Sequence, residues 1–200
     1  MAKGIRKVAQ IAVVAGTALA SAHQAAAQDI GGQTVVLKVA NRSSITPRCV
    51  EEAEAVASEI FNAIGVRLVW IDSAADVPPD LAPARRVTVV LPSQTELGRF
   101  LRGHNVKPTA LGVAPHDTNR VYIFPDRIVT LAFQSTTKAH SILGRVLAHE
   151  IGHQLLPNQG HSRDGIMRAD VNYSAADAPG FADDQAASIQ TLLSASLQPK

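Results

Sequence analysis

Residues 149–161 read HEIGHQLLPNQGH, and the histidines and glutamate that begin this run are the most informative pattern in the 200-residue chain. His149 and His153 are four positions apart, which on an α-helix corresponds to about 400° of rotation, so their side chains project side by side. Apolar residues around them recur at helical spacing and predict a buried stripe: Ile142, Leu143, Val146, Leu147, Ile151 and Leu155. The run therefore predicts a rigid helix that presents two imidazoles to one metal ion.

Glu150 adjoins the first of these histidines. Its carboxylate can lie beside the metal and accept the proton of a water molecule instead of occupying a coordination position. A bare HExxH also arises by chance in helices whose residues are simply solvated, so the surrounding sequence has to support the pattern. Because a catalytic zinc usually has three protein ligands and one open position, the chain must supply a third donor.

The downstream sequence narrows the choice of that third ligand. No glutamate occurs between Ile151 and Lys200, which excludes a later glutamate as ligand. His161 and Asp164 remain as near candidates. We prefer His161, because a neutral imidazole suits zinc and Gly160 before it can supply a turn. Asp164 stays open as an alternative, and otherwise it is a solvated turn residue.

The stretch HEIGHQLLPNQGHSRDGIM, residues 149–167, resembles the metzincin consensus HExxHxxGxxH followed by a methionine turn, and it is closest to the matrixin style. The resemblance implies one catalytic zinc ion, Glu150 as general base, Met167 as the turn methionine, and three zinc ligands: His149, His153 and His161. The third histidine follows the second by eight residues where the family has six, so the loop that contains Pro157 and Gly160 is longer than the family's.

The resemblance also implies a fold and a substrate. The fold is α+β of the zincin or metzincin type, with a twisted mixed sheet of four to five strands, a backing helix, the HExxH helix and a C-terminal helix. A peptide or protein substrate would bind in extended form along an edge strand at residues 111–114. Residues 168–173 would wall the specificity pocket, with Arg168 and Tyr173 as candidates for contact with substrate or oxyanion.

These observations favour an exported zinc metallopeptidase that hydrolyses peptide bonds. The alternative is a non-catalytic, zinc-stabilised peptide-binding protein of the cell envelope. The unusual histidine spacing and the small size favour this alternative, whereas the intact Glu150 counts against it, because a purely binding site has no need of that carboxylate.

The remaining histidines and the single cysteine have simpler interpretations. His140 precedes His149 by nine residues, half a turn out of phase on the helix, so it should point away from the metal. His104 and His116 flank segments rich in turn-forming residues and should be solvated. Cys49 is the only cysteine, which excludes an intrachain disulfide. Although Pro47, Arg48 and Cys49 superficially resemble the matrixin cysteine switch, we expect a buried structural thiol at the start of a core helix.

The first 27 residues have the three parts of a secretory signal peptide. Basic residues are followed by an apolar stretch over residues 8–22 and then by the small residues Ala25, Ala26 and Ala27. We therefore expect cleavage before Gln28, a secreted or periplasmic protein, and no stable membrane insertion afterwards, since the apolar stretch is short for a bilayer span.

Removal of that segment changes the charge of the chain. Taking Lys3, Arg6 and Lys7 from the 19 basic residues leaves 16, against 17 acidic residues. No basic stripe with interleaved aromatic residues is present, so nucleic-acid binding is not expected. Residues 28–200 suit a single metallopeptidase domain.

The order of secondary structure along the chain supports the same fold. Hydrophobic periodicity and turn residues predict strands at 34–40, 66–71, 87–91, 111–114 and 121–124. Helices are predicted at 47–64, 94–101, 137–156 and 183–196. The third of these helices carries the HExxH pattern.

Overall fold

The computed structural model describes residues 33–156, 160–169, 172–173 and 180–195. The chain divides into two compact units, residues 1–30 and 31–200, and all described residues belong to the second. The predicted signal peptide lies outside the described residues. Within the described part of the chain, no helix is both long and apolar enough to cross a membrane.

A five-stranded sheet forms the centre of this unit, with the strand order β2-β1-β3-β5-β4. Its strands are β1 (Thr34–Asn41), β2 (Arg67–Asp72), β3 (Arg85–Leu91), β4 (Gly112–Val113) and β5 (Arg120–Ile123). Every pairing is parallel except that of the edge strand β4, which runs antiparallel to β5. Because β1 and β3 are covered on both faces, their sequences are nearly continuous apolar runs.

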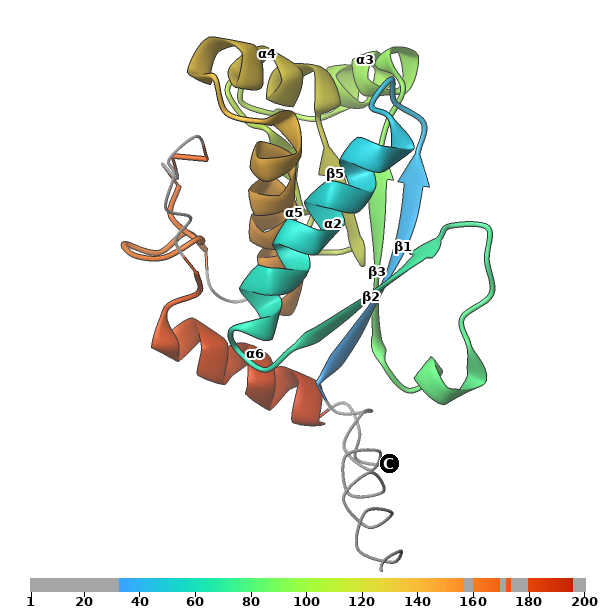
Figure 1. Ribbon diagram of the computed structural model, residues 1–200, viewed down its shortest axis with the longest axis vertical. Helices are drawn as coiled ribbons and strands as arrows, with labels where there is room; N and C mark the ends of the chain where they lie inside the picture. Colours follow the sequence, from blue (N-terminus) through green and yellow to red (C-terminus); the bar gives the residue numbers. More distant parts are fainter. Residues whose placement is uncertain (1–32, 157–159, 170–171, 174–179, 196–200) are drawn as a thin grey trace, which may run out of the picture. The chain divides into compact units, whose positions relative to one another are not determined.

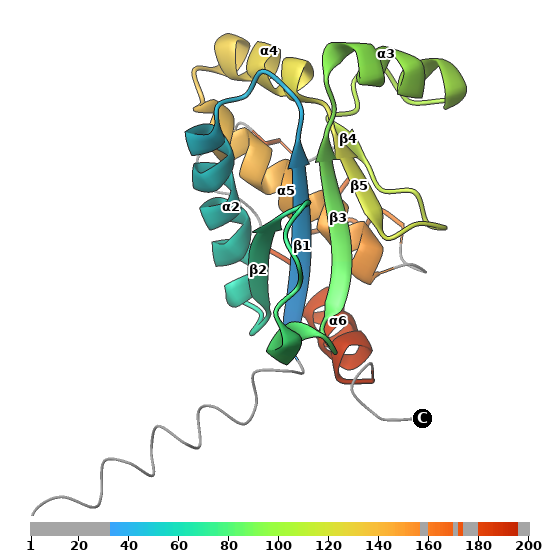
Figure 2. The same cartoon turned by 90° about the vertical axis from the view of Figure 1, so that its right-hand side faces the viewer.

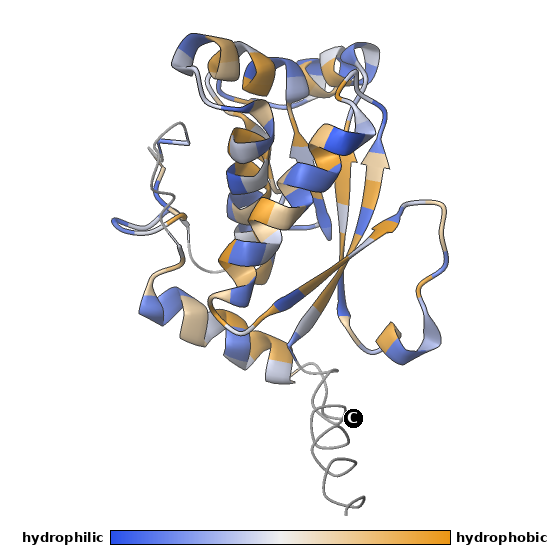
Figure 3. Ribbon diagram, in the orientation of Figure 1, coloured by the Kyte–Doolittle hydropathy of each residue, from blue (hydrophilic) through white to orange (hydrophobic). Residues whose placement is uncertain are grey.

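Two helices, α2 (Pro47–Asn62) and α5 (Ala139–Leu155), cross each other over one face of the sheet (Figures 1 and 2). The main core lies between these helices and the strands, and Phe61, Leu143 and Ile151 are fully buried in it. The opposite face carries a smaller cluster in which Leu81 of the 3-10 helix η1 (Pro79–Leu81) packs with Val36 and Ala84. Figure 3 shows hydrophobic residues concentrated along the strands, while the helices alternate between hydrophobic and hydrophilic positions.

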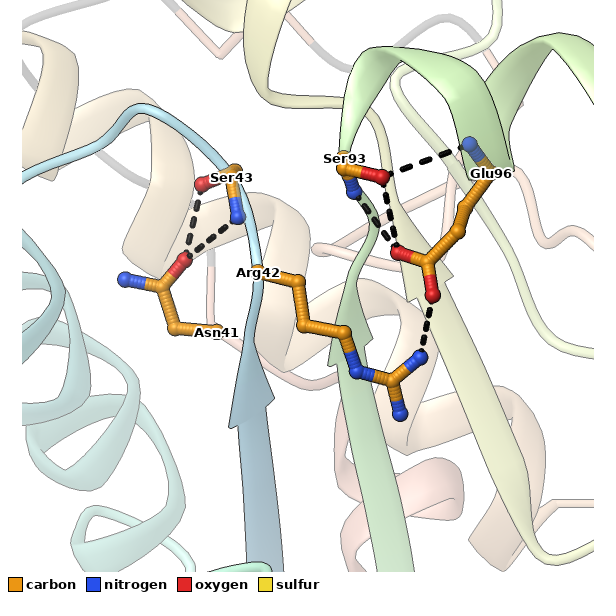
Figure 4. A network of polar contacts seen from close by, with 5 residues as sticks. All are labelled: Asn41, Arg42, Ser43, Ser93 and Glu96. Carbon is orange, nitrogen blue, oxygen red and sulfur yellow. Dashed lines mark hydrogen bonds and ion pairs between the residues drawn. The ribbon is translucent and has the colours of Figure 1, made fainter.

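The remaining helices are α3 (Gln94–Gly103), α4 (Pro125–Ser135) and α6 (Asp183–Ala195). A polar network joins the end of β1 to the start of α3 (Figure 4). The Ser93 hydroxyl accepts a hydrogen bond from the Glu96 backbone, and the Glu96 carboxylate accepts one from the Ser93 backbone, which forms a capping box. Arg42 forms an ion pair with the same carboxylate. The network holds α3 at the carboxyl ends of β1 and β3.

All nine predicted elements form, with bounds that differ from the predictions by at most two residues. The described residues form an α/β architecture, with a mixed five-stranded sheet and five α-helices. Helix α4 was not predicted. Pro125 is a suitable first helical residue, but Val129, Thr130 and Phe133 have weak helix propensity, so the local sequence gives little indication of the helix.

Candidate metal centre

His149 and His153 lie on adjacent turns of α5, and their rings meet edge to face with centroids 4.7 Å apart. His149 Nδ1 is 2.7 Å from the carbonyl oxygen of Ile166. A carbonyl only accepts hydrogen bonds, so Nδ1 carries the proton and Nε2 retains its lone pair. That Nε2 is 3.1 Å from Nε2 of His153. The backbone of Ile166 thus fixes the tautomer in which Nε2 of His149 is free to accept a metal ion.

His161 joins this pair from the segment after α5. One ring nitrogen of each of the three histidines lies within 4.8 Å of the others, an arrangement that could hold a metal ion. The His161 ring centroid is 5.3 Å from that of His149 and 5.0 Å from that of His153. Asp164, the alternative ligand, is exposed and does not belong to the cluster.

The chemistry of the three imidazoles fits zinc. Burial lowers the pKa of His149 to about 4 and that of His153 to about 3, so both rings are neutral at neutral pH. Two zinc-bound nitrogens at about 2.0–2.1 Å with tetrahedral angles lie about 3.3 Å apart, close to the observed separation of the two Nε2 atoms. The buried Nδ1 of His153 has no hydrogen-bond partner among the described residues.

Met167 packs against α5, in a turn that the chain makes after His161. Its side chain is fully buried, and a Cβ added to Gly152 of α5 would lie only 2.5 Å from its sulfur. Gly152 therefore allows the turn to pack directly on the helix. The turn is closed by a hydrogen bond of 2.9 Å from the Ser162 amide to the Met167 carbonyl, and Gly165 within it has a φ of 74°.

Glu150 lies between α5 and the edge strand β4. Its carboxyl group is buried, and this burial raises the pKa of Glu150 to about 8. A cation held by the neighbouring imidazoles would favour the ionised carboxylate. Gly112 of β4 is directly against the side chain, because a Cβ added there would be 2.8 Å from Glu150 Cγ and 2.9 Å from Oε1.

A cleft of about 710 Å³ opens onto the three histidines and Glu150. One wall is the segment 107–112, which includes part of the predicted substrate strand. A second wall is helix α4, and a third contains Ala169 and Tyr173. The α4 wall was absent from the sequence-based prediction, and its contributing side chains are Asp126, Arg127, Thr130, Leu131 and Gln134.

The two residues proposed from sequence to contact substrate differ in position. Tyr173 lines the cleft, with its ring centroid 6.0 Å from that of His149, and burial raises the pKa of its hydroxyl. Its carbonyl accepts a hydrogen bond of 2.7 Å from the buried Arg145. Arg168 is exposed and does not line the cleft. Residues 170 and 171 of the same predicted wall lie outside the described residues.

The other described histidines and the cysteine do not belong to the cluster, although His116 is near enough to His153 to contribute to its lowered pKa. His140 Nδ1 is 2.9 Å from a carboxylate oxygen of Glu52 on α2. His104 and His116 are exposed. Cys49 lies in the first turn of α2, only partly buried rather than fully buried as expected, with its thiol pKa raised by burial and then by Glu52. Neither His140 nor Cys49 lines the cleft.

Comparison with known proteins identifies similarity in fold only. No protein-family model matches the chain, and no curated protein sequence matches it. Among solved structures, it is similar to a zinc-dependent peptidase from Methanocorpusculum labreanum (strain Z), with 13% sequence identity and a TM-score of 0.50. The match covers 78% of this chain and 99% of that one. The chain therefore shares its fold with a zinc-dependent peptidase and has three histidines that could bind a metal ion.

Proposed function

We propose that this protein is a metzincin-like zinc endopeptidase in which Glu150 is the general base. The observation that carries the proposal is the convergence of three imidazoles beside a buried carboxylate at the floor of one cleft. The described residues show no other histidine, cysteine or carboxylate cluster of this kind. Its similarity in fold to a zinc-dependent peptidase supports the same class of reaction.

Each side chain has a definite part in the reaction. Zinc held by His149, His153 and His161 would supply Lewis acidity and would favour deprotonation of water near neutral pH. Glu150 accepts a proton from the water that attacks the scissile carbonyl, and then donates it to the leaving amine. The Ile166 carbonyl keeps the His149 ring in its ligating orientation throughout.

The substrate we propose is a peptide or protein segment bound in extended form beside β4. The strand is at the edge of the sheet and residues 110–112 line the cleft, which places backbone groups next to Glu150. We further propose that the enzyme acts after export, with residues 1–27 removed. N-terminal sequencing of the protein recovered from the cell envelope or medium should then begin at Gln28.

Three single variants test the catalytic proposal. Glu150→Gln keeps the size of the side chain but removes the base, so we expect zinc binding to persist and peptide cleavage to fall by about 10³-fold or more. His153→Ala should weaken zinc binding as well as cleavage. His140→Ala is the matched control, since this histidine is on the same helix but pairs with Glu52. The measurements are zinc content by mass spectrometry and cleavage of a quenched fluorescent peptide library.

The outcomes separate the two candidate functions. Cleavage by the parent protein that a chelator abolishes and zinc restores supports the peptidase. Full cleavage by Glu150→Gln would show that the assigned base is wrong. Zinc-dependent binding of peptides by the parent without cleavage of any library member would favour the non-catalytic peptide-binding protein.

A further inference from the structure

The edge strand β4 carries a glycine at the point where it meets Glu150. An added Cβ at Gly112 would lie 2.8 Å from Glu150 Cγ, 2.9 Å from Oε1 and 3.0 Å from the Tyr122 carbonyl oxygen. Non-bonded carbon atoms prefer about 3.5–4.0 Å, so a methyl group at this position would overlap the glutamate side chain by about 1 Å. The φ angle of Gly112 is not positive, and backbone conformation alone does not require glycine there. Glycine is required at this position because a larger residue would have no room for its side chain.

The strand has little freedom to move away from the helix. Gln154, one turn after Glu150 on α5, is buried and donates hydrogen bonds to the Pro115 carbonyl at 3.0 Å and the Arg120 carbonyl at 3.2 Å. Pro115 belongs to the connection between β4 and β5, and Arg120 is the first residue of β5. On the other side of Gly112, the Leu111 carbonyl accepts a hydrogen bond of 2.8 Å from the Phe124 amide. Both ends of β4 are thus fixed.

The glutamate is the mobile partner in this contact. Its side chain can rotate, whereas β4 and α5 are held by the hydrogen bonds of Gln154 and by the fully buried neighbours Ile123 and Ile151. A side chain at position 112 would therefore displace the carboxyl group of Glu150, not the strand. The displacement would move the proton acceptor relative to the three histidines.

We infer that Gly112 is a positioning residue, which sets the location of the Glu150 carboxylate by leaving its side of β4 free of a side chain. The inference rests on the proposed function for its effect on catalysis, while its geometric part stands alone. Because misplacement of a reacting group by about 1 Å can lower a rate by about 10²-fold, Gly112→Ala should lower kcat by about that factor. Zinc content should stay that of the parent, since no ligand moves.

The test is a double-variant cycle between positions 112 and 150. Glu150→Ala removes both Cγ and Oε1, the atoms that a methyl group at position 112 would meet. We expect Gly112→Ala to lower both kcat and the melting temperature in the parent background. In the Glu150→Ala background it should cost much less in melting temperature. Gly103→Ala is the matched control, since nothing lies within 4 Å of an added Cβ there.

Each result has a defined meaning. A Gly112→Ala protein with parental kcat overturns the inference while leaving the peptidase proposal intact. If the parent cleaves no peptide, the proposed function fails, and the melting-temperature cycle still tests the contact. If Gly112→Ala does not fold, restoration of folding by Glu150→Ala supports the inference. Equal destabilisation in both backgrounds overturns it, because the methyl group would then be meeting the backbone of Tyr122 alone.

Discussion

Gly144 lies where α5 crosses α2, and its replacement by alanine should weaken the packing of the two helices. An added Cβ would be 2.6 Å from the carbonyl oxygen of Ala53 and 2.6 Å from Cβ of Val56. The first neighbour is backbone, and the second is a β-branched side chain with one preferred rotamer in a helix. Neither can turn aside, so the helices would have to separate by about 1 Å to restore ordinary contact.

Two opposing effects determine the size of the change. In an open helical position, replacement of glycine by alanine stabilises by about 0.5–1 kcal/mol. Overpacking a close-packed core costs about 1–3 kcal/mol, and contact with rigid backbone favours the upper part of this range. We expect a net loss of about 1–2 kcal/mol. For a domain of this size the melting temperature should fall by about 2–8 °C.

The assay is thermal unfolding followed by circular dichroism, with zinc present at the same saturating concentration throughout. Gly98→Ala is the control, because this glycine is inside α3 and an added Cβ would meet only the Arg102 guanidinium at 3.6 Å. The control should melt at or slightly above the temperature of the parent. A Gly144→Ala protein that melts at or above the parental temperature would refute the packing argument.

Two further predictions concern pH and the cleft. Burial, followed by repulsion from Glu51, raises the pKa of Glu54 from 4.5 to about 7, so the folded protein binds this proton more tightly than the unfolded chain. This proton therefore contributes to the free energy of unfolding fully below about pH 4.5, and the contribution is lost as the pH rises through 7. Because the side chain is partly exposed, we expect the loss to be about 1 kcal/mol. Urea unfolding of the parent and of Glu54→Gln at pH 4.5 and 7.5 measures this loss. If the free energy of unfolding changes equally with pH in both proteins, Glu54 is not the group responsible. Arg127 donates to the carbonyls of Lys107 at 3.1 Å and Ala110 at 2.6 Å, which holds one cleft wall against α4. Arg127→Ala should raise KM about tenfold with little change in kcat or zinc content, whereas an unchanged KM in peptide cleavage would exclude this role.

The helices and strands could be predicted from the sequence because their signals are local. The apolar, β-branched run of β1 and the apolar stripe of α5 each depend on neighbours within a few residues. Helix α4 escaped prediction for the same reason, since its β-branched and aromatic residues oppose its local propensity. It is stabilised instead by tertiary contacts, such as the burial of Ile128 and the hydrogen bonds of Arg127 to the preceding loop.

For the candidate site, the sequence by itself determined that His149 and His153 share a face, because residues four positions apart on an α-helix project from the same side. The choice between His161 and Asp164 was open from spacing alone, since the path of a loop depends on what it packs against. Only the tertiary structure brought His161 to the other two imidazoles and placed Gly112 against Glu150. Such contacts join residues far apart in the chain, and their geometry is set by the packing of α5 on the sheet, which no local pattern specifies.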